Sequence, residues 1–388
     1  MRMELHILGT SSSRPAHGRE VSGSVVICDG KTILVDCGEG LQSRLQHHSS
    51  LLKANNWQHR IAHTRIDAML FTHGHLDHTW GAMPMLQSMA LDDRRRELTI
   101  AAPIHQDAYS ALLKDGYDAQ MPDTVAGVDM IEQMRMWWKL WIEKIERPIF
   151  PINWYVVSWP GGGESWLELK PHEKRVEKLA SRPQMFEGTL ISPHRTTHSV
   201  PSCAWRIGEA DRPGRFDGQK ARDLGLSNQE IAILAGGQDL EKDGQILLSE
   251  QFRGDDRSGL SLLISGDTGA EAPGLEALSE DKPLDLMVHE ATYVDEQEDK
   301  ARDYLHSTAR DAANVAKVAD ASHLVLTHYS SRLSESETSL EQARQVHRAV
   351  CNADDGDIFV IGKAGEVQLF RNERGVINEI SAPFADYR

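Results

Sequence analysis

The sequence predicts a layered α/β fold, and two observations support this prediction. Short apolar runs with the composition of β-strands alternate with amphipathic segments of helical periodicity. Several of these runs end in an acidic residue or a histidine, as expected where the strands of an α/β sheet carry side chains to a common edge. With 388 residues, 40% of them hydrophobic, the chain can form one large domain or two of ordinary size.

The formal net charge of −16 and the use of cysteine narrow the protein's partners and location. An acidic surface repels polyanions unless basic residues are concentrated locally. The four cysteines are scattered and form no C-x-x-C pair, which is typical of a reducing cytosol. The N-terminus shows no signal peptide, and no stretch reaches the roughly 18 apolar residues of a membrane helix. We therefore expect a cytoplasmic protein without membrane contact.

Expected strands and helices alternate in the first third of the chain. A strand is expected at 4–9 and a hairpin at 24–28 and 32–35, around the turn signal Asp29-Gly30. An amphipathic helix begins near Leu41. Further strands are expected at 66–71 and 97–101, with helices at 80–90 and 104–114.

Residues from about 115 to 188 break this pattern. They hold six of the nine tryptophans, a helical stretch at 130–145, and then Pro and Gly-Gly-Gly turn signals. We interpret this segment as an inserted subdomain, either with a small aromatic core of its own or as a cover, substrate wall or dimer surface near the functional site.

Regular signals return after residue 188. Strands are expected at 188–192, 260–265, 284–288, 323–327, 357–361 and 366–370, with helices at 309–319 and 340–351. Ser307 or Thr308 can cap the first of these helices. A polar, Gly-rich segment from about 208 to 257 is expected to form an arm-like excursion from a single domain that spans 1–388.

The most informative stretch is Thr72-His73-Gly74-His75-Leu76-Asp77-His78, directly after the apolar run at 66–71. A loop at a strand end can aim several of these side chains at one point. Imidazoles and a carboxylate suit zinc, and manganese or iron are alternatives. A solvated, His-rich turn is the competing interpretation, but the H-x-H-x-D-H spacing is much more constrained than that.

Other strand ends supply further candidate ligands, and their number indicates two metal ions. Seven side chains are too many for one tetrahedral zinc, whereas two ions about 3.5 Å apart with a bridging carboxylate would use them all. The candidate metal ligands are His73, His75, Asp77, His78, His198, Asp267 and His328.

At this point the chain resembles a known family. The H-x-H-x-D-H stretch is the hallmark of the metallo-β-lactamase superfamily, and the surrounding motifs are similar to those of its ribonuclease Z branch, the tRNA 3′-processing endonucleases. The resemblance implies a metallo-β-lactamase-type αββα sandwich. The motifs are Leu8-Gly9-Thr10, Val35-Asp36-Cys37-Gly38-Glu39-Gly40, His198-Ser199-Val200-Pro201-Ser202, Ser265-Gly266-Asp267-Thr268, His289-Glu290-Ala291-Thr292, His306-Ser307-Thr308 and Leu326-Thr327-His328-Tyr329-Ser330-Ser331-Arg332.

The resemblance also implies roles for these residues. One zinc ion would be held by His73, His75 and His198, and the other by Asp77, His78 and His328, with Asp267 bridging. Asp77 would also steer the attacking hydroxide that bridges the two ions. His306, positioned by Glu290, would protonate the leaving 3′ oxygen, while Asp36 would orient a ligand histidine and His289 would be structural.

The chain departs from the family where RNA would be recognised. The loop that senses the tRNA end has the form P-x-K-x-R-N, and here it reads Pro15-Ala16-His17-Gly18-Arg19-Glu20. The arm lacks the Gly-Pro that normally follows Leu226.

Three functions follow from the motifs and these departures. The first is a dinuclear zinc phosphodiesterase that cuts precursor tRNA, working as a homodimer. The second is a related hydrolase of a small phosphodiester, a cyclic nucleotide or an ester. The third, a non-catalytic binding protein, is disfavoured because every ligand and the proton donor are present.

Overall fold

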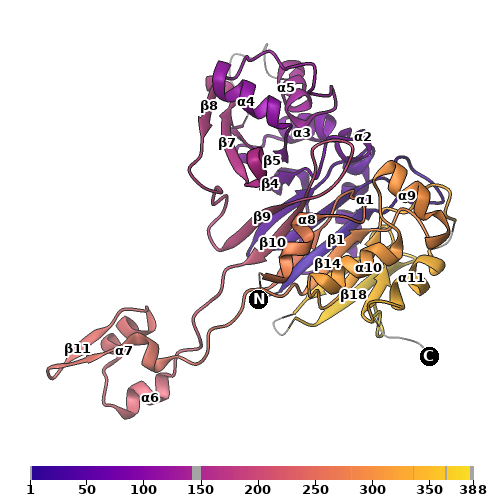
Figure 1. The fold of residues 1–388 in the computed structure, drawn as a ribbon. Coiled ribbons are helices and arrows are strands. Elements are labelled where there is room, and N and C mark those ends of the chain that lie inside the picture. The colour runs from indigo at the N-terminus through magenta and orange to yellow at the C-terminus, as the bar shows by residue number, and fades with distance from the viewer. Residues whose placement is uncertain (1, 142–149, 281, 335, 363–364, 385–388) are drawn as a thin grey trace. The chain divides into compact units, whose positions relative to one another are not determined.

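The computed structural model describes residues 2–141, 150–280, 282–334, 336–362 and 365–384. The chain divides into two compact units. One unit is formed by Met1–Gly208 together with Leu260–Arg388, and the other by Glu209–Gly259. Figure 1 shows the elements of both.

The first unit contains two sheets. Within the described residues, the larger sheet has 11 strands in the order β19-β18-β17-β1-β2-β3-β4-β5-β6-β7-β8. The pairs from β3 to β6 are parallel and the others are antiparallel. Its strands are β1 (Met3–Gly9), β2 (Gly23–Cys28), β3 (Lys31–Val35), β4 (Ala68–Leu70), β5 (Leu98–Pro103), β6 (Ile152–Ser158), β7 (Ser165–Lys170), β8 (Arg175–Lys178), β17 (Ile358–Ile361), β18 (Val367–Glu373) and β19 (Val376–Ile380).

The smaller sheet has six strands in the order β16-β15-β14-β13-β10-β9. The pairs from β13 to β16 are parallel, so the carboxyl ends of these strands lie at one edge, while β10 and β13 are antiparallel. The strands are β9 (Thr189–Arg195), β10 (Cys203–Glu209), β13 (Ser261–Ile264), β14 (Leu286–Glu290), β15 (Leu324–Thr327) and β16 (Val350–Asn352).

Helices of this unit cover the outer faces of both sheets (Figure 1). On the larger sheet these are α1 (Leu41–Ala54), α3 (Ala82–Leu91), α4 (Gln106–Asp115) and α5 (Met130–Trp141). On the smaller sheet they are α8 (Pro273–Glu276), α10 (Ala309–Val318) and α11 (Glu337–Arg344). The short helices α2 (Leu76–Thr79) and α9 (Glu298–Tyr304) lie close to the candidate site described below.

Three hydrophobic clusters define four layers, helix, sheet, sheet and helix. Alternate residues of one strand point to opposite faces, so Leu5 and Val26 pack between the two sheets, whereas Val25 packs under the helices of the larger sheet. A third cluster lies between the smaller sheet and its helices. This arrangement is the αββα sandwich that the resemblance implies.

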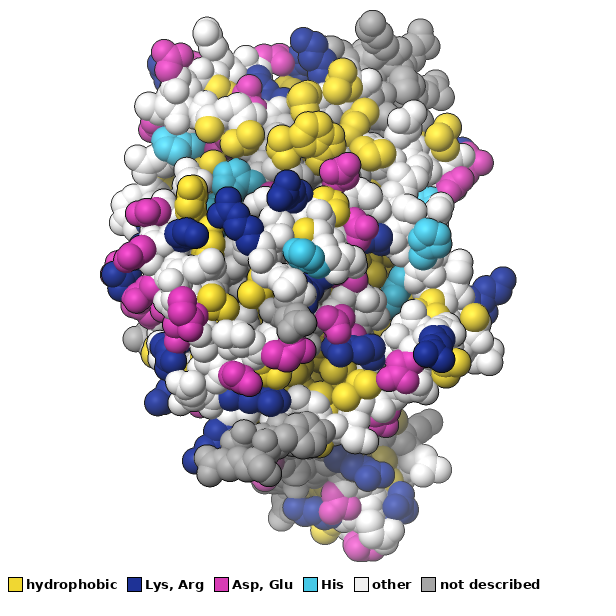
Figure 2. Space-filling view, turned by 90° about the vertical axis from the view of Figure 1, so that its right-hand side faces the viewer, with side chains coloured by type: hydrophobic (Ala, Val, Ile, Leu, Met, Phe, Trp, Pro, Cys, Tyr) yellow, Lys and Arg dark blue, Asp and Glu magenta, His cyan; other side chains and the backbone are white. Residues whose placement is uncertain are grey.

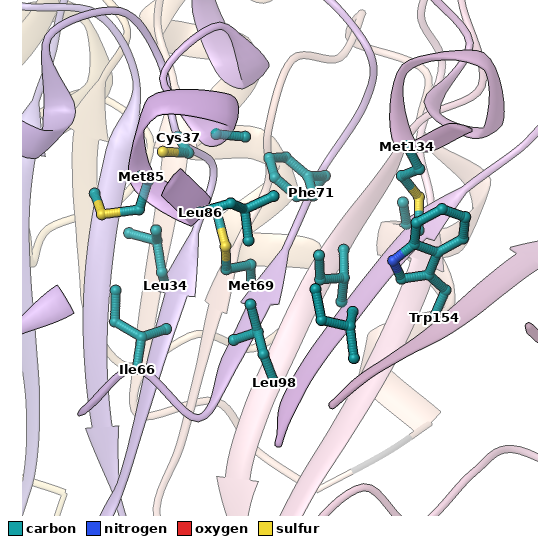
Figure 3. Packing of buried hydrophobic residues seen from close by; sticks show 14 of the residues in the cluster. Leu34, Cys37, Ile66, Met69, Phe71, Met85, Leu86, Leu98, Met134 and Trp154 are labelled. Carbon is teal, nitrogen blue, oxygen red and sulfur yellow. The ribbon is translucent and has the colours of Figure 1, made fainter. Parts of the chain in front are cut away.

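The tryptophan-rich segment differs from the expected subdomain. Its strands β6, β7 and β8 extend the larger sheet at one edge. Its buried residues Trp137 and Trp154 belong to the same cluster as Leu34 and Met69 of the central strands. Figure 3 shows Trp154 and Met134 next to each other, in the cluster that also contains Leu34 and Met69. The apolar helix and strands of this segment therefore enlarge an existing core, because the open sheet edge offers both backbone partners and apolar surface.

Four further elements of the first unit differ from the sequence prediction. The helix expected at 340–351 covers only Glu337–Arg344, and Val350–Asn352 pairs with β15 as β16. The strands β10 and β19 were not expected from the sequence. The strand β16 has only three residues and β19 is largely exposed, so neither carries a strong local signal. The strand β10 is largely buried, but its partner β13 lies beyond Glu209–Gly259 in the sequence.

The second compact unit contains α6 (Gly218–Asp223), α7 (Asn228–Ala235) and the hairpin of β11 (Leu240–Lys242) and β12 (Gln245–Leu247). It covers the range in which the sequence predicts an arm-like excursion. Ala221, Leu226, Leu234 and Phe252 form its small core. In the described part of the chain, no helix has the length and apolar character needed to cross a membrane.

Candidate metal centre and active site

The candidate ligands lie on loops that follow strands of both sheets. The H-x-H-x-D-H stretch follows β4 of the larger sheet and continues into α2. His198 lies between β9 and β10, Asp267 follows β13 and His328 follows β15 of the smaller sheet. All seven predicted metal ligands come together in two adjoining groups, and Asp267 belongs to both.

The first group consists of His73, His75, His198 and Asp267. The Nδ1 atom of His75 is 3.1 Å from His73 Nε2 and 3.0 Å from His198 Nε2. Asp267 Oδ2 is 3.7 Å from His73 Nε2 and 3.9 Å from His198 Nε2. Four donor atoms at such separations match a tetrahedral zinc site, in which bonds of about 2.0–2.1 Å place neighbouring nitrogens roughly 3.3 Å apart.

The second group consists of Asp77, His78, Asp267 and His328. The Nε2 atoms of His78 and His328 are 3.3 Å apart, and each is 3.3 Å from Asp267 Oδ1. Asp77 Oδ2 lies 3.7 Å from His78 Nε2 and 3.6 Å from His328 Nε2. The two oxygens of Asp267 therefore face different groups, as a bridging carboxylate requires.

The unsatisfied polar atoms of this cluster fit a metal ion. Asp267 is almost fully buried, and its Oδ1 has no hydrogen-bond partner in the described part of the chain. A buried carboxylate oxygen without a partner is costly unless a cation or donor compensates it. The donor set of five imidazoles and two carboxylates suits a divalent ion such as zinc.

The ring nitrogens that face away from the two groups are held by hydrogen bonds. His78 Nδ1 donates to Asp36 Oδ2 at 2.7 Å, and His198 Nδ1 donates to the carbonyl of Leu305 at 2.9 Å. His328 Nδ1 lies 3.0 Å from the hydroxyl of Thr292. Such bonds fix the tautomer, so that the lone pair of each Nε2 faces the group.

Asp36 supports the centre without belonging to either group. Besides His78, its carboxylate accepts hydrogen bonds from the backbone N–H and the hydroxyl of Thr72, both at 2.8 Å. Asp36 has a positive φ of 59° at the end of β3, which places its carboxylate beside the loop after β4. This agrees with the predicted role of orienting a ligand histidine.

Glu290 and His306 form a pair beside the metal groups. His306 Nδ1 donates to Glu290 Oε1 at 2.8 Å, and it lies 3.9 Å from Asp267 Oδ2. Glu290 is also held by the backbone N–H of Thr268 at 3.0 Å and the hydroxyl of Thr292 at 2.6 Å. Because Nδ1 is engaged, the proton that His306 can give away is the one on Nε2.

The loop backbones are packed too closely for side chains at two glycines. A Cβ on Gly74 would lie 1.8 Å from the carbonyl oxygen of Val128, and one on Gly266 would lie 2.4 Å from the Cβ of Thr72. Gly266 also has a φ of +61°, which disfavours other residues. Close backbone packing therefore fixes the loops that carry His73 and Asp267.

Burial and neighbouring charges separate the protonation states of the histidines. Burial and the nearby His198 lower the pKa of His75 to about 4, which keeps it neutral and able to bind a metal. Burial also disfavours charge on His306, but Glu290 outweighs this effect and raises the pKa of His306 to about 9. Burial opposes the charge of His78 as well, yet Asp267, Asp36 and Asp77 raise its pKa well above its usual range.

Three residues of the site were not assigned a role from the sequence. Thr72 and Thr292 connect carboxylates to histidines, as described above, and the backbone N–H of Ser13 donates to Asp77 Oδ2 at 2.7 Å. Thr72 precedes the candidate ligand His73, and Thr292 ends the motif that contains Glu290, so these motifs pointed to both threonines. No sequence pattern identifies a backbone donor. His289, expected to be structural, is buried outside both groups, and its Nδ1 donates to the carbonyl of Glu290.

A cavity of about 640 Å³ opens onto the centre. Its lining includes the candidate ligands Asp77 and Asp267, His306, and the exposed Tyr304. A cavity of this size accommodates a ligand as large as a nucleotide.

Comparison with solved structures supports the fold assignment. The chain is similar to the metallo-β-lactamase fold protein YhfI from Bacillus subtilis, with a TM-score of 0.56, 16% identity and coverage of 93% of this chain and 100% of that one. It is also similar to the short form of human tRNase Z, with a TM-score of 0.53, 20% identity and coverage of 93% and 99%. A family model described as anti-Pycsar protein Apyc1 matches residues 3–138.

The fold and the two adjoining ligand groups define a metal-dependent hydrolase with the metallo-β-lactamase fold. Among curated proteins, the ribonuclease Z of Haloferax volcanii is 30% identical over 363 residues, which cover 93% of each chain. The ribonuclease Z of Halorubrum lacusprofundi is 30% identical over 365 residues, covering 93% of this chain and 98% of its own. The chain belongs to the ribonuclease Z family.

Proposed function

We propose that this protein is an endoribonuclease that removes the 3′ trailer of precursor tRNA. The observation that carries the proposal is the Glu290–His306 pair beside two groups of metal ligands, with 2.8 Å between Nδ1 and Oε1. A proton donor next to a two-metal site suits hydrolysis of a phosphodiester with a poor leaving group. Membership of the ribonuclease Z family supports RNA as the substrate.

We propose that the two groups would each hold a zinc ion and that Asp267 would be available to both. His73, His75 and His198 complete one site, and Asp77, His78 and His328 complete the other. When bound, the ions supply a nucleophilic water at neutral pH and neutralise charge on the scissile phosphate. Manganese or iron would suit the same ligands.

The remaining roles belong to side chains that move or hold protons. Asp77, fixed by the N–H of Ser13, orients the attacking water. His306 gives its Nε2 proton to the leaving 3′ oxygen, and Glu290 holds the ring in position. Water adds to phosphorus, the bond from phosphorus to the 3′ oxygen breaks, and the products carry a 3′ hydroxyl and a 5′ phosphate.

A second candidate, hydrolysis of a small phosphodiester or cyclic nucleotide, is favoured by the recognition surfaces. In the loop expected to sense the tRNA end, Arg19 is already engaged, because its guanidinium lies 4.7 Å from the ring centroid of Tyr329 and donates to Ser336. Acidic residues outnumber basic ones in Glu209–Gly259. On the face shown in Figure 2, basic and acidic side chains are interspersed without a continuous basic band.

The two candidates are separated by their substrates. Purified, zinc-loaded protein is incubated with a precursor tRNA that carries a 3′ trailer and, separately, with bis-p-nitrophenyl phosphate. We expect one specific cut after the discriminator base. Hydrolysis of the small diester without specific tRNA cleavage would refute the first candidate and support the second.

Two variants test the assignment of roles. His306→Ala should lower turnover by about 10²- to 10⁴-fold while the metal content stays unchanged, as expected for a general acid. Asp267→Ala should lose metal, because both groups share this carboxylate. Loss of metal from His306→Ala would contradict its assignment as the proton donor.

The quaternary state and location are further proposals. The family resemblance favours a homodimer, which light scattering at micromolar concentration would test. The four cysteines are free and buried, which is consistent with the proposed cytoplasmic location.

A further inference from the structure

A second cavity adjoins the metal centre on the side of His198. It has a volume of about 390 Å³, and His198 and Ser199 line both it and the larger cavity that contains His306. Small-molecule sites have volumes of roughly 300–1,000 Å³, so this space can hold one nucleotide. The smaller cavity therefore reaches the metal groups at His198, and the larger cavity reaches them at Asp77, Asp267 and His198.

The two cavities differ in charge. The larger cavity is lined by the carboxylates Asp77, Asp267 and Asp303 and also by two arginines, Arg14 and Arg332. Among the residues that the structure describes, no carboxylate lines the smaller cavity. Its cationic side chain is Arg195 at the end of β9. Within the described parts of the chain, this exposed guanidinium has no hydrogen-bond or ion-pair partner. On a protein with a net charge of −16, such a lining is suited to an anion.

An aromatic ring and a hydrogen-bond donor complete the smaller cavity. Trp159, directly after β6, is partly buried and packs against the core between the sheets, which holds its ring in place. His105 accepts the N–H of Asp107 through Nδ1 at 3.2 Å, so the neutral ring carries its proton on Nε2. A fixed indole ring, a donor and a cation are the groups that bind a nucleobase and a phosphate.

We propose that this smaller cavity binds the first nucleotide of the 3′ trailer, with its base against Trp159 and its 3′ phosphate paired with Arg195. The inference rests on the proposed endoribonuclease function. The nucleotide that carries the leaving 3′ oxygen must lie beside His306, in the larger cavity. The nucleotide joined through the 5′ oxygen of the same phosphate then occupies the other space.

The test compares two precursor tRNAs that differ only in the first trailer nucleotide, which is either normal or abasic. Trp159→Ala should reduce kcat/KM for the normal precursor about tenfold or more, since a stacked base is lost. The same variant should cleave the abasic precursor as well as the unchanged protein does. The zinc content should be unaffected.

Matched variants separate the subsite from general damage. Trp159→Phe keeps an aromatic ring and should therefore retain most of the preference for the normal precursor over the abasic one. Trp80→Ala, which removes an exposed tryptophan outside the cavity lining, should have no effect. Arg195→Gln should weaken binding of both precursors and reduce the dependence of log KM on log salt by about one charge. If Trp159→Ala reduced kcat/KM equally for the normal and the abasic precursor, or for neither, the proposal would be overturned.

A direct binding measurement tests the subsite independently of the proposed endoribonuclease activity. A 5′-phosphorylated dinucleotide, the chemical form of the released trailer, is titrated into the zinc-loaded protein by calorimetry. Binding that Trp159→Ala abolishes supports the subsite even if precursor tRNA is not cleaved, an outcome that would refute only the endoribonuclease assignment. Specific tRNA cleavage without dinucleotide binding would refute only the subsite.

Discussion

At the scale of single residues, Asp36 shows how the centre depends on side chains that touch no metal. One carboxylate accepts hydrogen bonds from Thr72 and from His78, so it connects the end of β3 to the loop after β4. Partners of this kind orient a ligand imidazole and raise its basicity.

Asp36→Asn should therefore lower the affinity for the ion proposed at the group that contains His78 by about 10- to 100-fold. The amide fills the same space but cannot offer the same acceptor charge to His78. Competition with a zinc chelator measures the effect. Asp92→Asn, which changes an exposed carboxylate paired with His63, serves as the control and should leave both affinities unchanged.

A second residue-scale prediction concerns Glu4, a fully buried carboxylate on β1. Burial raises its pKa, but His6, with Nε2 at 3.4 Å from Oε2, and the hydrogen bond from Trp57 outweigh burial and lower the pKa from 4.5 to about 2. A carboxylate with a lowered folded-state pKa stabilises the protein above its unfolded pKa. That stability, up to roughly 3 kcal/mol, is lost as the pH falls from 4.5 towards 2.

Urea unfolding at pH 7 and at pH 3 measures this loss. Glu4→Gln should be less stable than the unchanged protein at pH 7, and the difference should shrink at pH 3. Glu177→Gln, at an exposed position on β8, should show no such pH dependence. A constant difference between Glu4→Gln and the unchanged protein at both pH values would contradict the prediction.

The ligands were predictable from sequence because their chemistry is written in residue types and spacing. His73, His75, Asp77 and His78 fall within six consecutive positions, and a loop of that length can hardly separate them. The contact of Ser13 was not predictable, because a backbone N–H has no distinctive pattern. Thr292 stands in a motif, but the contact of its hydroxyl with His328 depends on distances that only the structure gives.

At the scale of elements, the helix α10 illustrates a boundary set by local chemistry. Thr308 accepts the N–H of Asp311 at 3.1 Å, and Asp311 in turn accepts the N–H of Thr308 at 2.9 Å. This capping box begins the helix directly after His306 and so fixes the end of the loop that carries the proton donor.

Thr308→Ala should destabilise the protein by about 1 kcal/mol, the usual cost of losing an N-cap. Thr308→Ser keeps the hydroxyl and should recover most of that stability. The midpoint of urea unfolding reports both variants. Equal stability of the alanine and serine variants would show that the cap does not contribute.

Elements with strong local signals were predicted well, while those defined by distant partners were not. Strand β1 and the hairpin of β2 and β3 lie where apolar runs and a turn signal place them. The strands β6 and β7 were assigned to a separate insertion, because the sequence does not reveal that the edge at β5 is open to pairing. Sheet-edge pairing is a tertiary property.

At the scale of the whole molecule, the second compact unit is connected through two neighbouring strands. Glu209–Gly259 leaves from β10 and returns to β13, and these strands pair antiparallel with Gly208 opposite Ser261. A two-residue turn can join such a pair. The unit can therefore be removed without disturbing the sheet.

We expect the protein with Glu209–Leu260 replaced by Asn-Gly, which joins the paired residues Gly208 and Ser261 by a two-residue turn, to keep its metal content and its hydrolysis of bis-p-nitrophenyl phosphate. Its kcat/KM for precursor tRNA should fall at least tenfold if this unit grips RNA. Retention of full activity on precursor tRNA would show that the unit takes no part in recognition.

The candidate metal ligands are distributed over both sheets, and this couples metal binding to correct folding. His73 to His78 follow a strand of the larger sheet, whereas Asp267 and His328 follow strands of the smaller one. Because each proposed ion draws ligands from both sheets, its binding free energy is available only when the sheets have packed face to face. An incompletely folded chain would then lack the metal sites, so the protein would cut RNA only after folding is complete.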